Sequence, residues 1–174
     1  DTSLEIQINY TLNVPPLPAP AHDKKPGIYG YSSVQTNFVD WYSFIPPINE
    51  SGDWVLHKPG YYGEYLVYDL ANFDISIEII NNPANTLIAA STIPIQQDET
   101  HYSFRSSNAR NFVWSIGPSY EVDSMDHNGI TITTYAFPFH QFANAHLLTE
   151  TSKAIDLFSR LFSPYPRENL TIVE

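Results

Sequence analysis

The sequence contains no cysteine and few basic residues: eight lysines and arginines stand against nineteen aspartates and glutamates among 174 residues. The absence of cysteine excludes a disulfide scaffold, catalysis by a thiol and zinc sites built from thiolates, but it leaves the cellular compartment open. The formal net charge of −11 argues against a nucleic-acid partner, because nucleic acids are bound by basic surfaces.

Long apolar runs are also missing, since no stretch approaches the about 20 apolar residues that a membrane-spanning helix needs. No internal repeat is visible either. Hydrophobic residues make up 43% of the chain and are spread along it, which indicates a globular protein. The chain opens directly on a strand-like alternation of apolar residues, so we expect any targeting segment to lie upstream.

Strand patterns dominate up to about residue 136. In the clearest one, Phe73, Ile75, Ile77 and Ile79 alternate with polar residues, and this period of two predicts a half-buried strand. Similar short runs cover residues 4–14, 29–37, 54–57, 87–91, 101–106, 111–116, 120–125 and 130–137. Their spacing predicts a mainly β fold, a sandwich or saddle of antiparallel sheets. The Asn128-Gly129 pair predicts a tight hairpin turn between the last two runs.

The pattern changes after residue 138. Residues 139–162 have a helical period, Pro164 and Pro166 end the helix, and a short terminal strand follows. We therefore predict a β domain over residues 1–138 and, over 139–174, the first helix and strand of a following domain. In an isolated chain we expect this helix to cover an apolar face or edge of the sheet. Earlier in the chain, residues 15–27 contain five prolines and predict an extended surface loop.

No motif for metal binding or catalysis is found. None of the six histidines forms a His-x-x-x-His pair, and His140 and His146 fall on different faces of a helix. The stretch from Ser124 to Gly129 resembles a calcium loop only faintly, because serine takes the first ligand position and Tyr135 the position that requires glutamate. No Gly-x-Ser-x-Gly nucleophile motif occurs. We predict no catalytic residue, cofactor site or metal site in this chain.

Aromatic residues are abundant and allow two interpretations. They gather in two clusters, which are Phe38, Trp41, Tyr42 and Phe44, and then Trp54, Tyr61, Tyr62 and Tyr65. Packing into a β core is the simpler interpretation. The alternative is a free-standing β-sandwich module that binds carbohydrate or protein through exposed rings.

The end of the chain resembles a known family. A helix, the sequence Phe162-Ser-Pro-Tyr-Pro166 and a strand ending in Val173-Glu174 are similar to the entry into the catalytic domain of gluzincin zinc aminopeptidases, such as aminopeptidase N and leukotriene hydrolase. Residues 29–47 resemble that family's Thr-Gln-x-Glu or Thr-Gln-x-Gln strand and the aromatic-proline turn after it. The segments that begin at Glu64 and Asn108 resemble two further strands of its saddle-shaped domain.

This resemblance implies a non-catalytic N-terminal domain of a zinc metallopeptidase, with zinc held in the parent's catalytic domain downstream. The expected partners are that catalytic domain and a peptide substrate in the cleft that the two domains share. Gln35 and Asn37 match the family's cleft-wall strand, although Asn37 is shorter than the family's glutamine and lacks the charge of its glutamate. Localisation stays open, with a lean toward an extracytoplasmic or membrane-anchored parent.

Overall fold

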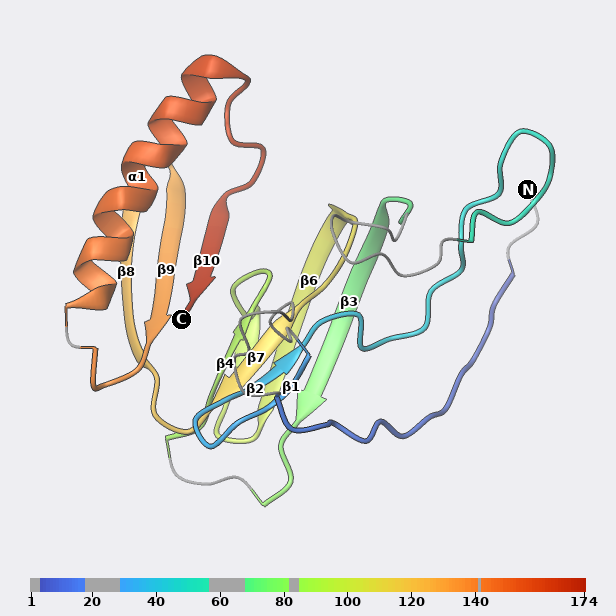
Figure 1. Cartoon of the computed structure of the whole chain (residues 1–174), viewed down its shortest axis with the longest axis horizontal. Coiled ribbons are helices and arrows are strands. Elements are labelled where there is room, and N and C mark those ends of the chain that lie inside the picture. The colour runs from blue at the N-terminus through green and yellow to red at the C-terminus, as the bar shows by residue number, and fades with distance from the viewer. Residues whose placement is uncertain (1–3, 18–28, 57–67, 82–84, 141) are drawn as a thin grey trace, which may run out of the picture.

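The computed structural model describes residues 4–17, 29–56, 68–81, 85–140 and 142–174, and these residues form three small sheets and a helix (Figure 1). The strands are β1 (Gly30–Tyr31), β2 (Thr36–Phe38), β3 (Ala71–Glu78), β4 (Leu87–Ala90), β5 (Gln96–Gln97), β6 (His101–Ala109), β7 (Trp114–Gly117), β8 (Glu121–His127), β9 (Ile130–Ala136) and β10 (Asn169–Val173), and the helix is α1 (Ala143–Leu161). The fold is mainly β, as the sequence predicts.

The first two sheets form a sandwich. One has the order β1-β2-β7-β4 and the other β3-β6-β5, and all their pairings are antiparallel. The core between them contains residues of both sheets and of the turn after β6, namely Ile88, Ala90, Tyr102, Phe104 and Phe112. On β3, the alternation predicted from the sequence is confirmed, because Phe73, Ile75 and Ile77 pack against this core while their neighbours are exposed.

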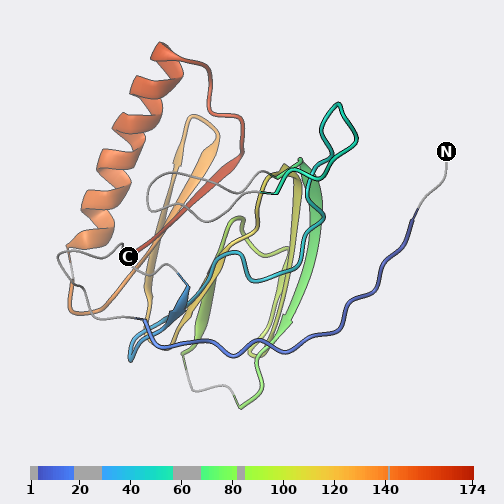
Figure 2. The same cartoon turned by 45° about the vertical axis from the view of Figure 1, so that its right-hand side comes forward.

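The third sheet has the order β10-β9-β8 and carries the helix. β8 and β9 are a hairpin whose turn places Asn128 at φ 55° and Gly129 at φ 80°, which confirms the predicted Asn-Gly turn. β10 pairs in parallel with β9 through five residues, after α1 has crossed over the sheet. A second core forms here from Ile130, Ile132, Leu148 and Ile155. Figures 1 and 2 show α1 and this sheet standing beside the sandwich.

Two predicted strands are not paired as strands among the described residues. Residues 4–14 are extended and outside any ladder, and they run away from the sandwich in both views (Figure 2). The run 54–57 contributes a single bridge, between Ile48 and Trp54, and its last residue lies outside the described part. Most of the proline-rich segment 15–27 also lies outside it. Strand β5, only two residues long, was not predicted because two glutamines carry no strand pattern.

The helix packs through fewer residues than its sequence pattern suggests. Leu148 and Ile155 are its buried residues, whereas Phe158, Leu161 and Phe162 are 55%, 59% and 80% exposed. The helical period of residues 139–162 puts these three side chains on the apolar side of the helix, but they are not buried. The reason is that the hairpin β8–β9 ends before the last turn of α1: His127, next to the hairpin turn, contacts Asp156, and Phe158 and Leu161 lie beyond it.

Candidate functional site

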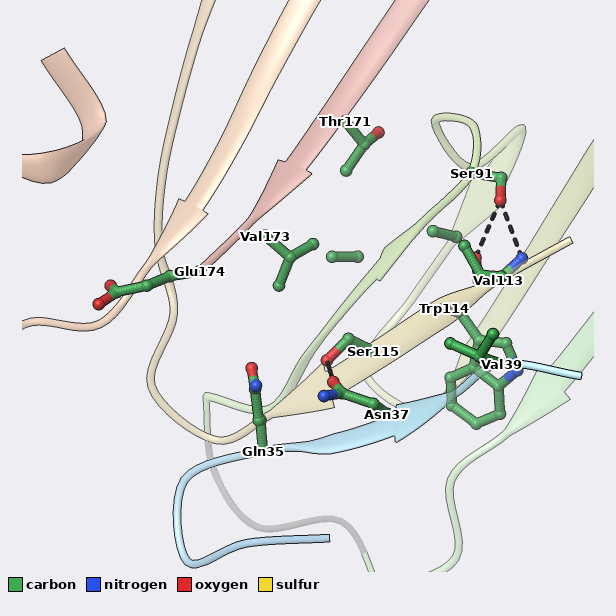
Figure 3. A pocket seen from close by; sticks show the side chains of 12 residues that line it. Gln35, Asn37, Val39, Ser91, Val113, Trp114, Ser115, Thr171, Val173 and Glu174 are labelled. Carbon is green, nitrogen blue, oxygen red and sulfur yellow. Dashed lines mark hydrogen bonds between the residues drawn. The ribbon is translucent and has the colours of Figure 1, made fainter. Parts of the chain in front are cut away.

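A pocket of about 300 Å³ lies where the sandwich meets the third sheet (Figure 3). β2, β4 and β7 form one wall and β10 forms the other. Its lining residues are Gln35, Asn37, Val39, Ala89, Ala90, Ser91, Val113, Trp114, Ser115, Thr171, Val173 and Glu174. Both residues that the sequence assigned to a cleft wall, Gln35 and Asn37, thus border the same pocket.

A hairpin positions Gln35 and Asn37. The hydroxyl of Ser32 accepts the N–H groups of Val34 and Gln35 at 3.2 and 3.1 Å, which closes the turn between β1 and β2. β2 then pairs with β7, so that Asn37 lies opposite Ser115. Successive side chains of a strand alternate between its two faces, and residues 35 and 37 therefore point the same way.

Each of these amides accepts a hydrogen bond from a hydroxyl group, and Figure 3 shows the bond between Ser115 and Asn37. The Oγ of Ser115 donates to Oδ1 of Asn37 at 2.6 Å, and the phenol of Tyr120 donates to Oε1 of Gln35 at 2.9 Å. The two hydroxyl oxygens are 2.8 Å apart. Burial raises the pKa of the Tyr120 phenol above its ordinary value, so this group stays protonated and keeps its role as a donor at neutral pH.

The network uses the amide oxygens and leaves the amide nitrogens. Within the described residues, neither Nε2 of Gln35 nor Nδ2 of Asn37 has a hydrogen-bond partner. Each –NH₂ group carries two donor hydrogens. The wall can therefore donate hydrogen bonds to a ligand's carbonyl or carboxylate oxygen, whereas each of its amide oxygens already accepts one hydrogen bond.

The opposite wall ends in a carboxylate. Along β10, Thr171 and Val173 line the pocket while Leu170 and Ile172 pack on the second core, as alternation requires. The carboxylate of Glu174 accepts the backbone N–H of Phe137 at 2.9 Å and also contacts the His140 ring. Figure 3 shows this carboxylate directed away from Asn37 and Ser115.

Sequence reasoning missed Ser115, Tyr120 and Glu174 as parts of this site. Glu174 stood in the matched Val-Glu ending but was given no role. Nothing in the sequence marks Ser115 or Tyr120. Ser115 lies 78 residues after its partner Asn37, and Tyr120 lies 85 residues after its partner Gln35, so only the folded chain brings them together.

The other candidates from the sequence remain separate from this pocket. Among the described residues, no three histidine, aspartate or glutamate side chains are grouped so as to hold a metal ion. In the first aromatic cluster, Phe38 stacks on Trp114 with ring centroids 3.8 Å apart, and Nε1 of Trp41 donates to the carbonyl of Phe112 at 3.0 Å. These rings pack inward. Trp54 is exposed, and Tyr61, Tyr62 and Tyr65 lie outside the described residues.

No protein-family model matches the chain, and no curated protein sequence shows significant similarity to it. The helix found in the described part of the chain is not long and apolar enough to cross a membrane.

Proposed function

We propose that this chain is the non-catalytic N-terminal region of a zinc metallopeptidase of the gluzincin aminopeptidase type. In this role it braces the catalytic domain and forms one wall of the substrate cleft. The observation that carries the proposal is the common pocket of Gln35 and Asn37, opposite β10. The residues matched to the family's cleft-wall strand and those matched to its Val-Glu strand, separated by more than a hundred positions, border one cavity.

The chemistry of the wall suits a peptide. Peptide carbonyls accept hydrogen bonds, and the free –NH₂ groups of Gln35 and Asn37 can supply them. A free amine would instead need several acceptors, and one of the two lone pairs on Oδ1 of Asn37 is already engaged by Ser115. The proposal therefore assigns this wall to the peptide backbone, and it assigns recognition of the substrate's free amine to groups outside it.

Zinc chemistry belongs elsewhere under this proposal. The described residues contain no set of zinc ligands, so the metal, which would act as a Lewis acid and activate water, is assigned to the catalytic domain. This chain supplies shape and hydrogen-bond donors. On its own it is expected to be inactive.

The first test is the reading frame beyond Glu174. A His-Glu-x-x-His sequence within about a hundred residues would support the proposal, because two histidines one helical turn apart suit a tetrahedral zinc site. A stop codon directly after Glu174 would contradict it and favour the free-standing binding module instead.

The second test uses the extended protein with its zinc. Replacing Asn37→Leu removes a donor from the wall, and we expect KM for a peptide substrate to rise about tenfold with little change in kcat, because the lost hydrogen bond binds the substrate before and during reaction. Asn9→Leu is the control, since Asn9 is exposed and is not one of the lining residues of the pocket. Equal kinetics of the two variants would contradict the role of Asn37.

A further inference from the structure

A second pocket collects most of the chain's arginines. It has a volume of about 830 Å³ and lies between the end of β6 with the turn that follows and the segment that leads into β10. The sequence has four arginines, and Arg105, Arg110 and Arg167 all line this pocket. The fourth, Arg160, is in the last turn of α1. In a chain with a net charge of −11, this is an unusual concentration of positive charge.

The three guanidinium groups differ in how they are held. Arg105 pairs with Asp74 at 2.8 Å, with both side chains more than 60% exposed. Arg167 donates from Nη1 to the carbonyl of Ser107 at 2.6 Å and from Nη2 to that of Asn108 at 2.5 Å. Arg110 is exposed and has no hydrogen bond or ion pair within the described residues.

The local backbone keeps Arg167 in place. Asn108 has a φ of 51°, and its N–H is held by the side chain of Asn72 at 3.0 Å. This conformation presents the two carbonyls to Arg167. A guanidinium has five N–H groups, so Arg167 retains three donors after these two bonds. Neutral donors complete the lining, among them Ser106 and Asn111.

Carboxylates compensate this charge only in part. Glu168 is the one acidic residue among the lining residues of the pocket, and Asp74 is occupied by Arg105. Three cations brought to one cavity repel each other, and a bound anion would relieve the repulsion. Arginine is the residue best suited to this task, because its planar fork matches the two oxygens of a carboxylate or phosphate.

We propose that this pocket binds a small oxyanion, the carboxylate or phosphate group of a soluble ligand, with Arg110 as its principal contact and Arg167 as the second. The bound anion bridges the β6–β7 turn of the sandwich and the segment before β10, and so it holds the two halves of the chain together. This inference does not depend on the proposed peptidase function.

Titration of the whole chain with inorganic phosphate and with citrate, followed by calorimetry and thermal unfolding, tests the proposal. We expect saturable binding and a raised Tm for the wild type. Arg110→Gln should weaken binding about tenfold or more, because hydrogen bonds to charged groups are the strong ones. Arg110→Lys keeps the positive charge but loses the planar guanidinium, and its affinity should fall between those of the wild type and Arg110→Gln. The two anions distinguish a phosphate-selective from a carboxylate-selective pocket.

Two controls separate this site from general salt effects. Arg160→Gln removes one charge outside the pocket and should bind both anions as the wild type does. Sodium chloride at matched ionic strength should not reproduce the rise in Tm, although it screens an acidic chain. The proposal is overturned if Arg110→Gln and Arg160→Gln bind the anions with equal affinity. It is also overturned if sodium chloride raises the Tm as much as phosphate does.

Discussion

At the scale of single residues, the first pocket depends on Ser115. Ser115 is buried, with 6% of its surface exposed, and its one hydroxyl group contacts both Asn37 and Tyr120. Ser115→Ala would leave the half-buried Oδ1 of Asn37 without this donor. We expect a loss of about 1 kcal/mol in the free energy of unfolding, the usual net value of one hydrogen bond, measured by urea denaturation.

A matched serine provides the control for that variant. The Oγ of Ser124, on β8, has no hydrogen-bond partner in the described part of the chain, and the residue is exposed. Ser124→Ala should change the free energy of unfolding by less than about 0.5 kcal/mol. If Ser115→Ala is equally neutral, the hydroxyl network does not stabilise the pocket.

The exposed carboxylate of Asp98 gives a prediction about pH. Its side chain accepts the backbone N–H groups of Thr100 and His101 at 2.9 and 2.8 Å, and these bonds lower the pKa of Asp98 in the folded state. A lowered pKa means that the stabilisation is present above the unfolded value of about 3.9 and is lost as pH falls through the folded value. Stability should therefore decline in acid partly through this residue.

Asp98→Asn isolates that effect. Asparagine keeps an oxygen that can accept both N–H groups but cannot titrate, so the variant should lose less stability than the wild type between about pH 5 and about pH 2. Urea midpoints measured across this range provide the check. Asp53→Asn removes an exposed carboxylate that makes no hydrogen bond or ion pair within the described residues, and this variant should follow the wild-type curve. If the urea midpoint of Asp98→Asn falls with pH as steeply as that of the wild type, Asp98 does not contribute to the loss of stability in acid.

The sequence could identify part of the first pocket at this scale. Alternation along a strand places residues 35 and 37 on one face, and the family resemblance assigned that face to a cleft. Ser115 and Tyr120 could not be found in this way, because their contribution follows from the register of β2 against β7. Register depends on which strands pair, and a single strand's pattern does not contain that information.

At the scale of elements, α1 shows that the apolar side of a helix need not be buried along its whole length. The helical period was right, and the stop at Pro164 agrees with a helix that ends at Leu161. The pattern could not show that the apolar stripe is longer than the strands it covers. A helix buries only the residues for which a partner exists, and the last turn extends beyond the hairpin.

Two variants of α1 test the contrast between its buried part and its exposed last turn. Ile155→Ala removes a side chain that is 8% exposed in the second core, and it should cost about 2–5 kcal/mol through lost burial and an unfilled cavity. Phe158→Ala removes a ring that is 55% exposed and should cost less than about 1 kcal/mol, with thermal unfolding as the measurement. A larger loss for Phe158→Ala would mean that the last turn is buried in solution.

At the scale of the whole molecule, the chain has two cores that meet through polar contacts. The contacts between the halves include the bonds of Arg167 to the β6 end and a bond of 3.2 Å from Asn169 to Thr92. The predicted boundary near Pro138 falls between β9 and α1, whereas strands on its two sides pair with each other in one sheet. The change of pattern from strand to helix located the boundary, but a sheet can combine strands from before and after a helix. The domain division remains a prediction.

Two truncations decide where that boundary lies. A chain ending at residue 138 keeps the β8–β9 hairpin but removes α1 and β10, which exposes Ile130 and Ile132 and frees one edge of β9. A chain ending at residue 120 removes the whole third sheet and keeps Tyr120 bonded to Gln35. Since an exposed apolar face and an unpaired strand edge both favour aggregation, we expect the shorter chain to be the more soluble and to unfold cooperatively. Size-exclusion chromatography and urea denaturation of both chains measure their solubility and cooperativity. A monomeric, cooperatively folded chain of residues 1–138 would contradict this expectation and place the boundary at Pro138.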